Sequence, residues 1–528
     1  MSLIIIDGGR YLSDKKSKLA SGSIINFLGS VILRFGGFIY RFILSRLLTT
    51  TGYGIVGLTL PFQNIFIIGA SGGVPPAIAK YVSQYKAVDD ERMVHQIIVT
   101  GLKLMIFMSI IAAVLMFLIS EPVAIGMWNK PEALLPLRLV SIIIPFSVIV
   151  GAIRGVFQGF YDMKSIFYSK FIEQIFTIIL ASLLVILGWY AAGAVLGTAL
   201  GFLVSLLGSY YLYRRDVKDY YSKGNFEKIS FHDELSLMKE ILKFSIPVVV
   251  SGVAEIFLYD TGTFFIGMFL PAFFAGFFTN ASAIARIPLM IANSVSTSIL
   301  PATSEADSLQ DKQLLKMYMH QSFRYTAVTS LPISAFIMVY AVPVMVLLFG
   351  SEYAQGAEAL WILVGGMFFF SIYLIASSMC QGLGKPTFPM YALITGAIIN
   401  AIASYLLIPM FNITGAAIST TLSTFVLMMI TVTQLNKLSG ISAPYKDLAK
   451  ILVASAFMVF VMYLIPKTIL GMIIGGIVGS IVYIIVILLL KAIKPEDVGL
   501  IEHLVNKTGP LKKRLLKIVK MIKIYLEN

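Results

Sequence analysis

The sequence has few charged residues and almost no cysteine. Only 13% of its 528 residues are Asp, Glu, Lys or Arg, against roughly 25% in an average soluble protein. Too few charges remain to cover a water-exposed surface of this size, so the solvent for most side chains must be lipid. The single cysteine, Cys380, excludes an intrachain disulfide and a cysteine-based metal cluster.

Motifs of enzymes and cofactor-binding proteins are also missing. The four histidines are scattered, and no phosphate-cradling GxxxxGK[ST] loop, HExxH motif or nucleophile elbow occurs. We therefore expect no enzyme, no cofactor and no metal site. An ATP-driven pump within this chain alone is excluded on the same ground.

Long apolar runs make up most of the chain. The hydrophobic fraction is 58% and the mean hydropathy is +0.88. A transmembrane helix needs about 20 mostly apolar residues. Windows of that length predict about fourteen spans, at 22–48, 53–82, 95–120, 133–157, 163–187, 189–213, 240–269, 272–302, 317–349, 356–381, 386–408, 413–436, 446–466 and 469–491. Prolines 61, 75, 76, 288 and 301 are the predicted kink sites. The predicted fold is an all-α polytopic membrane protein.

The positive charge follows the pattern of membrane topology. The net charge of +14 is gathered in alternate loops, which are cytoplasmic by the positive-inside rule. This predicts a multi-pass protein of the cytoplasmic membrane with both termini inside, and no nucleic-acid partner. In the tail, residues 492–528, the stretch LKKRLLKIVKMIKIYL (511–526) alternates basic and apolar residues at helical spacing. We expect it to lie on the anionic lipids of the inner leaflet.

Two parts of the chain resemble each other at an offset of 222 to 226 residues. The matching pairs include His95-Gln96 with His320-Gln321, Gln158-Gly159 with Gln381-Gly382, and Gly193-Ala194 with Gly415-Ala416. The repeat covers six spans, so both copies have the same orientation, as in parallel transporter repeats around a central cavity. The predicted organisation is a six-helix bundle (1–213), a cytoplasmic linker (214–239), a second six-helix bundle (240–437) and two extra helices, spans 13 and 14 (438–491).

This arrangement of six, six and two spans resembles the multidrug/oligosaccharidyl-lipid/polysaccharide exporter superfamily. Within it, the chain is most similar to the polysaccharide-biosynthesis branch, whose members are oligosaccharide-lipid flippases. The resemblance covers residues 20–490 and is carried by GYGIVGLTLPFQNIF (52–66), SGGVPPAIAKYVSQY (71–85), ARIPLMIANSVSTSILPATSE (285–305), QGLGKP (381–386) and NITGAAISTTLS (412–423).

Two arginines lie within the first apolar run. Arg34 and Arg41 are seven residues apart and project from nearly one helix face. Because charge in a lipid environment is costly, such residues are functional candidates. We favour a substrate-facing role for both. The alternative is a buried ion pair with Glu255 or Asp260 of the seventh span. Lys170 with Glu173 as its partner, and Arg324, are interpreted as structural.

The resemblance adds further site residues. It implies that Arg34, Arg41 and Arg286 line a central cationic cavity, where guanidinium groups suit the phosphate of a lipid-linked sugar. It also implies a cation site among spans seven, eleven and twelve, for Na⁺ or H⁺. The matching positions are Asp260, Asn400, Ser404 and Thr420. An ordinary packing role for Asn400 and Thr420 stays open, because Ser404 replaces an acid that some relatives carry.

The predicted function is an alternating-access flippase. It would move a lipid-linked oligosaccharide, on polyprenyl phosphate or pyrophosphate, across the membrane for cell-surface polysaccharide or glycan assembly. The alternative is a cation-coupled multidrug antiporter of the same superfamily. A cationic drug would prefer an acidic cavity, whereas the intramembrane charges here are mostly basic. A membrane glycosyltransferase is set aside, because outer loops such as GWYAAG (188–193) leave no room for a catalytic domain.

Overall fold

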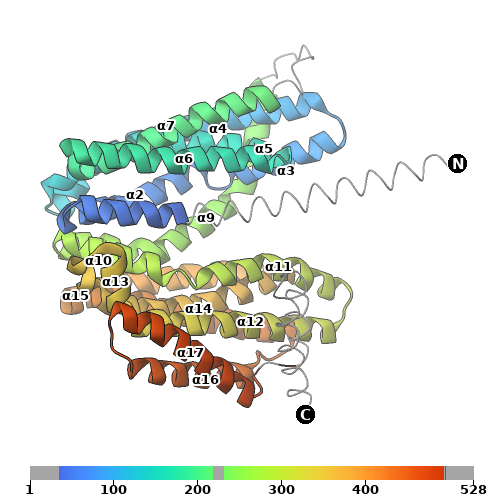
Figure 1. Ribbon diagram of the computed structural model, residues 1–528. Coiled ribbons are helices and arrows are strands. Elements are labelled where there is room, and N and C mark those ends of the chain that lie inside the picture. Colours follow the sequence, from blue (N-terminus) through green and yellow to red (C-terminus); the bar gives the residue numbers. More distant parts are fainter. Residues whose placement is uncertain (1–34, 218–230, 493, 495–528) are drawn as a thin grey trace, which may run out of the picture. The chain divides into compact units, whose positions relative to one another are not determined.

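The computed structural model describes residues 35–217, 231–492 and 494 (Figure 1). Every regular element among these residues is helical. The helices follow from the apolar runs, because in lipid a helix satisfies its own backbone hydrogen bonds. The basic tail 492–528 lies almost entirely outside the described residues, so its helix stays a prediction.

The first group of helices begins with a helical segment at 35–47. The elements that follow are α2 (Thr50–Ser71), α3 (Val74–Ala87), α4 (Glu91–Glu121), η1 (Pro122–Met127), η2 (Pro131–Ala133), α5 (Leu134–Gly159), α6 (Met163–Leu184), η3 (Val185–Trp189), α7 (Tyr190–Asp216) and α9 (Phe231–Phe269).

The remaining elements run from α10 to α17. They are α10 (Ala272–Ala285), α11 (Leu289–Ser308), α12 (Lys312–Val339), α13 (Ala341–Phe349), η4 (Ser351–Gly356), α14 (Ala357–Gly382), α15 (Thr387–Ser439), α16 (Tyr445–Tyr463) and α17 (Ile469–Leu489). The extra helices α16 and α17 pack on α12 through a buried cluster that includes Tyr340, Met458 and Tyr483.

Eight helices of the described residues are long and apolar enough to cross a membrane, and ten if each bent pair is one span. Two of the eight, Met163–Asp216 and Thr387–Ser439, each cover two predicted spans and are interrupted by a residue with non-helical backbone angles. The polytopic helical fold is therefore confirmed, while the count of fourteen stays a prediction. Of the predicted kink sites, Pro288 lies in the turn that forms the 48° bend between α10 and α11, but Pro61 and Pro301 lie inside helices.

The backbone carries the same repeat as the sequence. Residues with positive φ recur at an offset of 221 to 223, in the pairs Asp89 and Gln310, Asn129 and Gly350, Tyr161 and Gly384, and Tyr190 and Asn412. A close helix contact recurs too. A Cβ at Gly159 would lie 3.1 Å from the Ala79 carbonyl oxygen, and a Cβ at Gly382 would lie 2.7 Å from that of Leu300. Both copies therefore need glycine where α5 crosses α3 and where α14 crosses α11.

The chain divides into two compact units, one ending at Gly276 and the other beginning at Phe277. The first unit extends past the predicted 214–239 linker and includes α9, which packs against α2, α3 and α4. Three polar contacts hold α9 there: Lys103 Nζ with Glu234 Oε1 at 2.7 Å, Asn64 Nδ2 with Asp260 Oδ2 at 2.9 Å, and Lys130 Nζ with the Gly267 carbonyl at 2.6 Å. The physical reason for the later boundary is that these contacts run along the whole length of α9.

Candidate functional site

The structure describes one of the two arginines of the first apolar run. Arg34 lies outside the described residues. Arg41 is half-buried on the 35–47 helix, where its side chain hydrogen-bonds Tyr53 of α2. The adjacent Tyr40 hydroxyl lies 3.1 Å from Thr198 Oγ1 of α7. This helix therefore packs inside the first unit, with Arg41 directed towards a polar partner.

Arg286 lies at the break between α10 and α11. Residues 286–288 form a turn, and the two helices meet at 48°. The Arg286 carbonyl accepts a hydrogen bond from Leu289 N at 3.2 Å, and its side chain is half-buried. Arg41 belongs to the first unit and Arg286 to the second. Their convergence on one cavity stays a prediction.

The two acids named as alternative ion-pair partners lie on α9. Asp260 accepts the hydrogen bond from Asn64 and is half-buried, while Glu255 is exposed. Each also has further polar or electrostatic interactions. Because Arg34 is not described, a pair between it and either acid stays a prediction.

Three of the predicted cation-site residues lie on α15 and are buried. The Ser404 hydroxyl donates to Asn400 Oδ1 at 3.3 Å, and the Thr420 hydroxyl donates to the Ala416 carbonyl at 3.0 Å. The fourth residue, Asp260, belongs to the other unit. Among the described residues, no three His, Cys, Asp or Glu side chains gather into a metal site. The cation site stays a prediction, and so does the packing alternative.

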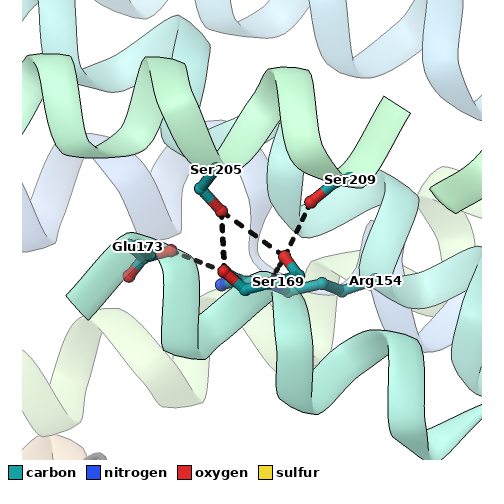
Figure 2. A network of polar contacts seen from close by, with 5 residues as sticks. All are labelled: Arg154, Ser169, Glu173, Ser205 and Ser209. Carbon is teal, nitrogen blue, oxygen red and sulfur yellow. Dashed lines mark hydrogen bonds and ion pairs between the residues drawn. The ribbon is translucent and has the colours of Figure 1, made fainter. Parts of the chain in front are cut away.

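Sequence reasoning missed a polar network centred on Arg154 (Figure 2). Arg154 of α5 donates from Nη2 to Glu173 Oε2 at 2.6 Å and from Nε to Ser169 Oγ at 2.8 Å, both on α6. It also reaches Ser205 Oγ of α7 at 3.2 Å, and Ser169 Oγ lies 2.7 Å from Ser209 Oγ. Three helices thus place five polar side chains together within the first unit.

This network corrects the interpretation of Glu173. Its ion-pair partner is Arg154 of the facing helix α5, at 2.6 Å, and not Lys170. The sequence did not mark Arg154 as a site candidate, because it lies only five residues before the end of its helix. A side chain at that position can reach the membrane surface. Its position in the apolar run VIVGAIRGVF was the available signal.

Arg324 is deeply buried. Only 1% of the residue is exposed, and its Nη1 lies 3.3 Å from Asp447 Oδ2 at the first turn of α16. This pair anchors the extra helices to α12. The structural interpretation of Arg324 agrees with this contact.

Two known protein families match parts of this chain. Residues 19–307, more than half of the chain, match the family described as polysaccharide biosynthesis protein. The chain belongs to that family. Residues 247–406 also match the MatE family, so this polysaccharide biosynthesis protein lies within the multidrug/oligosaccharidyl-lipid/polysaccharide exporter superfamily.

Relatives of this family member match about four fifths of its length. The lipid II flippase MurJ of Bacillus subtilis is 24% identical over 479 residues, which cover 84% of this chain and 87% of the relative. An uncharacterized membrane protein of Methanocaldococcus jannaschii is 26% identical over 422 residues, covering 78% and 96%. A solved structure of lipid II flippase MurJ in an inward closed conformation superposes with a TM-score of 0.70 at 16% identity, covering 88% of this chain and 98% of that one. The fold is thus that of the exporter superfamily.

Proposed function

We propose that this protein is an alternating-access flippase for a lipid-linked oligosaccharide. The observation that carries the proposal is its similarity to a lipid II flippase over 84% of the chain, in sequence and in fold. Lipid II is the cargo of that relative, and the glycan carried here is a separate question. Such a protein moves its substrate without making or breaking a covalent bond in it, so we propose a transporter and not an enzyme.

The mechanism we propose uses arginine as the phosphate ligand. A guanidinium offers paired donors that match phosphate oxygens and keeps its charge at any physiological pH. Arg34, Arg41 and Arg286 would hold the polyprenyl phosphate or pyrophosphate headgroup, while the lipid tail stays in the bilayer. Because Arg286 lies where α10 bends into α11, a change in that bend would move the guanidinium along with the headgroup.

The orientation belongs to the same proposal. In this proposal the basic loops and both termini lie on the cytoplasmic side, as the positive-inside rule predicts, and the substrate enters from the inner leaflet of the cytoplasmic membrane. The tail at 492–528 would rest on anionic lipids there. Na⁺ or H⁺, bound at Asp260, Asn400, Ser404 and Thr420, is the proposed coupling ion.

A cation-coupled multidrug antiporter is the second candidate, and the MatE match at 247–406 favours it. One experiment separates the two. Purified protein is reconstituted into proteoliposomes, with a polyprenyl-pyrophosphate oligosaccharide in one set and a lipophilic cation in another, with and without Na⁺ and H⁺ gradients. The flippase predicts that the labelled sugar becomes accessible to an external glycosidase. Cation uptake without sugar translocation would establish the antiporter instead.

A further inference from the structure

The Arg154 network faces the interior of the first unit. On α6, Tyr168 and Ile179 are 51% and 53% exposed and mark the outward side of the helix. Lys170 follows Tyr168 by two residues, which is about 200° around the helix axis. Glu173, one turn further on, lies on nearly the same inward side, and the next residue, Gln174, contacts Gly36 of the 35–47 helix. Lys170 and Glu173 of α6 therefore point away from lipid.

This interior cluster has an excess of positive charge. Glu173 is bound to Arg154, and the Lys170 ammonium, whose charge interacts with both, has no ion-pair partner of its own in the described part of the chain. Two cations thus share one carboxylate. An excess charge inside a membrane protein is costly unless a counter-charge or water is present. The arrangement is suited to an anion.

Arg154 is positioned to bind such an anion. Ser169 and Ser205 fix its guanidinium together with Glu173 (Figure 2). Among the described residues no acceptor meets its Nη1, and the side chains of Arg154 and Glu173 keep 17% and 24% of their surface exposed. A partly exposed guanidinium with donors to spare can bind a phosphate oxygen.

The depth of the cluster matches a lipid headgroup. Arg154 lies five residues before the end of α5, and Lys170 seven residues after the start of α6. At 1.5 Å per residue, both lie roughly 7 to 11 Å from those helix ends. The same end of the unit carries Lys164, Arg214 and Arg215, which the charge pattern assigns to the cytoplasm.

We propose that Arg154 and Lys170 form a phosphate subsite inside the first unit, near its cytoplasmic end. The ligand is the phosphate of a polyprenyl-linked substrate. Glu173 holds Arg154 in place until that phosphate displaces the Glu173 carboxylate. This inference rests on the proposed function and adds a subsite to it. Anionic phospholipids share the phosphate chemistry, but the inward direction of Lys170 favours the substrate.

Binding of a simple probe tests the subsite without transport. The full-length protein in nanodiscs of neutral lipid is titrated with a polyprenyl monophosphate, and separately with phosphatidylglycerol and with the uncharged polyprenol. Lys170→Gln removes the unpaired cation and leaves the Arg154–Glu173 pair intact. Lys164→Gln is the matched control, because it removes an exposed lysine of the same helix outside the cluster.

The proposed subsite predicts that Lys170→Gln and Glu173→Gln change the affinity for polyprenyl phosphate in opposite directions. Lys170→Gln weakens polyprenyl phosphate binding about tenfold, close to 1.4 kcal/mol, while Lys164→Gln changes it less than about twofold. Glu173→Gln tightens binding several-fold, because it removes the carboxylate that competes for Arg154. Polyprenol binding is the same in all three variants. Unfolding temperatures identify any variant that is misfolded, and Lys170→Gln alone then decides the question.

Three results would overturn the proposal. Equal effects of the two lysine variants would make Lys170 a general surface charge. Weaker binding in a folded Glu173→Gln protein would make the network a structural ion pair. Parallel losses for phosphatidylglycerol would make it a site for bulk lipid. Failure of the proposed function is a separate result, because then the wild-type protein would not translocate the sugar whatever its binding of polyprenyl phosphate.

Discussion

Tyr190 and Asn412 share one rare backbone conformation, with φ and ψ of 44° and −133° at Tyr190 and of 53° and −137° at Asn412. Asn412 lies 222 positions after Tyr190, so the two residues occupy equivalent places in the repeat. Each begins the second helix of a hairpin, α7 in one copy and the second half of α15 in the other. This conformation is unfavourable for a residue with a Cβ. Its recurrence at equivalent positions therefore supports a common origin of the two hairpins.

Glycine at either position should stabilise the protein. Tyr190 is 71% exposed and Asn412 is also exposed, so little packing is lost. Relief of the strained φ should raise the free energy of unfolding by about 1 kcal/mol for Tyr190→Gly and for Asn412→Gly. Thermal unfolding in detergent micelles measures the effect. Asn412→Val is the control and should lower the unfolding temperature, and a lower temperature in both glycine variants would contradict the interpretation.

Asp447 should contribute to stability through Arg324 and hardly at all through Lys494. The Arg324 side chain is 2% exposed and lies 3.3 Å from Asp447, whereas Lys494 is 44% exposed and lies 3.7 Å away. Asp447→Asn removes a carboxylate that faces a buried cation and should cost about 3 kcal/mol. Lys494→Gln should cost less than about 0.5 kcal/mol. Adding Arg324→Met to Asp447→Asn should recover part of the loss. Similar losses in the two single variants would refute this distinction.

Lys130 should hold the end of α9 more strongly than Lys103 holds its beginning. Lys130 is 9% exposed and donates to the carbonyls of Gly267 and Trp128, while the Lys103 side chain is 58% exposed. Burial lowers the pKa of the Lys130 ammonium, and Glu132 partly offsets this. Lys130→Met leaves two carbonyls without their donor and should cost about 2 to 4 kcal/mol. Lys103→Gln should cost less than about 1 kcal/mol. Chemical denaturation of purified protein tests the order, which the reverse ranking would contradict.

Arg286 should be needed for transport but not for folding. Arg286→Ala should abolish sugar translocation in proteoliposomes while membrane abundance stays near that of the wild type, and the same is expected of Arg34→Ala. Arg286→Lys should restore transport in part, because an ammonium keeps the charge but loses the paired donors. A sharp fall in abundance for Arg34→Ala, reversed by also removing Glu255 or Asp260, would show a structural ion pair instead.

The predicted topology places Ser222 inside and Asn412 outside. With Cys380 replaced, single cysteines at these positions should react differently with a membrane-impermeant thiol reagent on intact cells. Asn412→Cys should be labelled, since the residue is exposed at the break in α15, and Ser222→Cys should be labelled only after lysis. The opposite pattern would invert the orientation.

The limits of α14 were predictable because they depend on local composition, whereas the predicted spans 272–302 and 317–349 are each broken into two helices. The predicted span at 356–381 corresponds to α14 at Ala357–Gly382, since a run of apolar residues bounded by glycines and charges defines its own length. Contacts between helices were not predictable in this way. Arg154 hydrogen-bonds Ser205, which lies 51 positions later in the sequence, and the local sequence around either residue does not predict this contact. The assignment of α9 to the first unit depends likewise on distant partners such as Asn64 and Lys130.

The attachment of α9 also bears on the order in which the protein is made. Insertion of the helices that precede α9 leaves the α9-facing sides of α2, α3 and α4 without their partner, and these sides are covered only after residue 269 has been synthesised. A ribosome that stalls between the two repeats would therefore release an incompletely folded first unit that lacks α9. Such a product is accessible to proteases and to membrane chaperones. For the same reason, a gene split after codon 276 should give complementing halves, whereas a split at the repeat boundary should not.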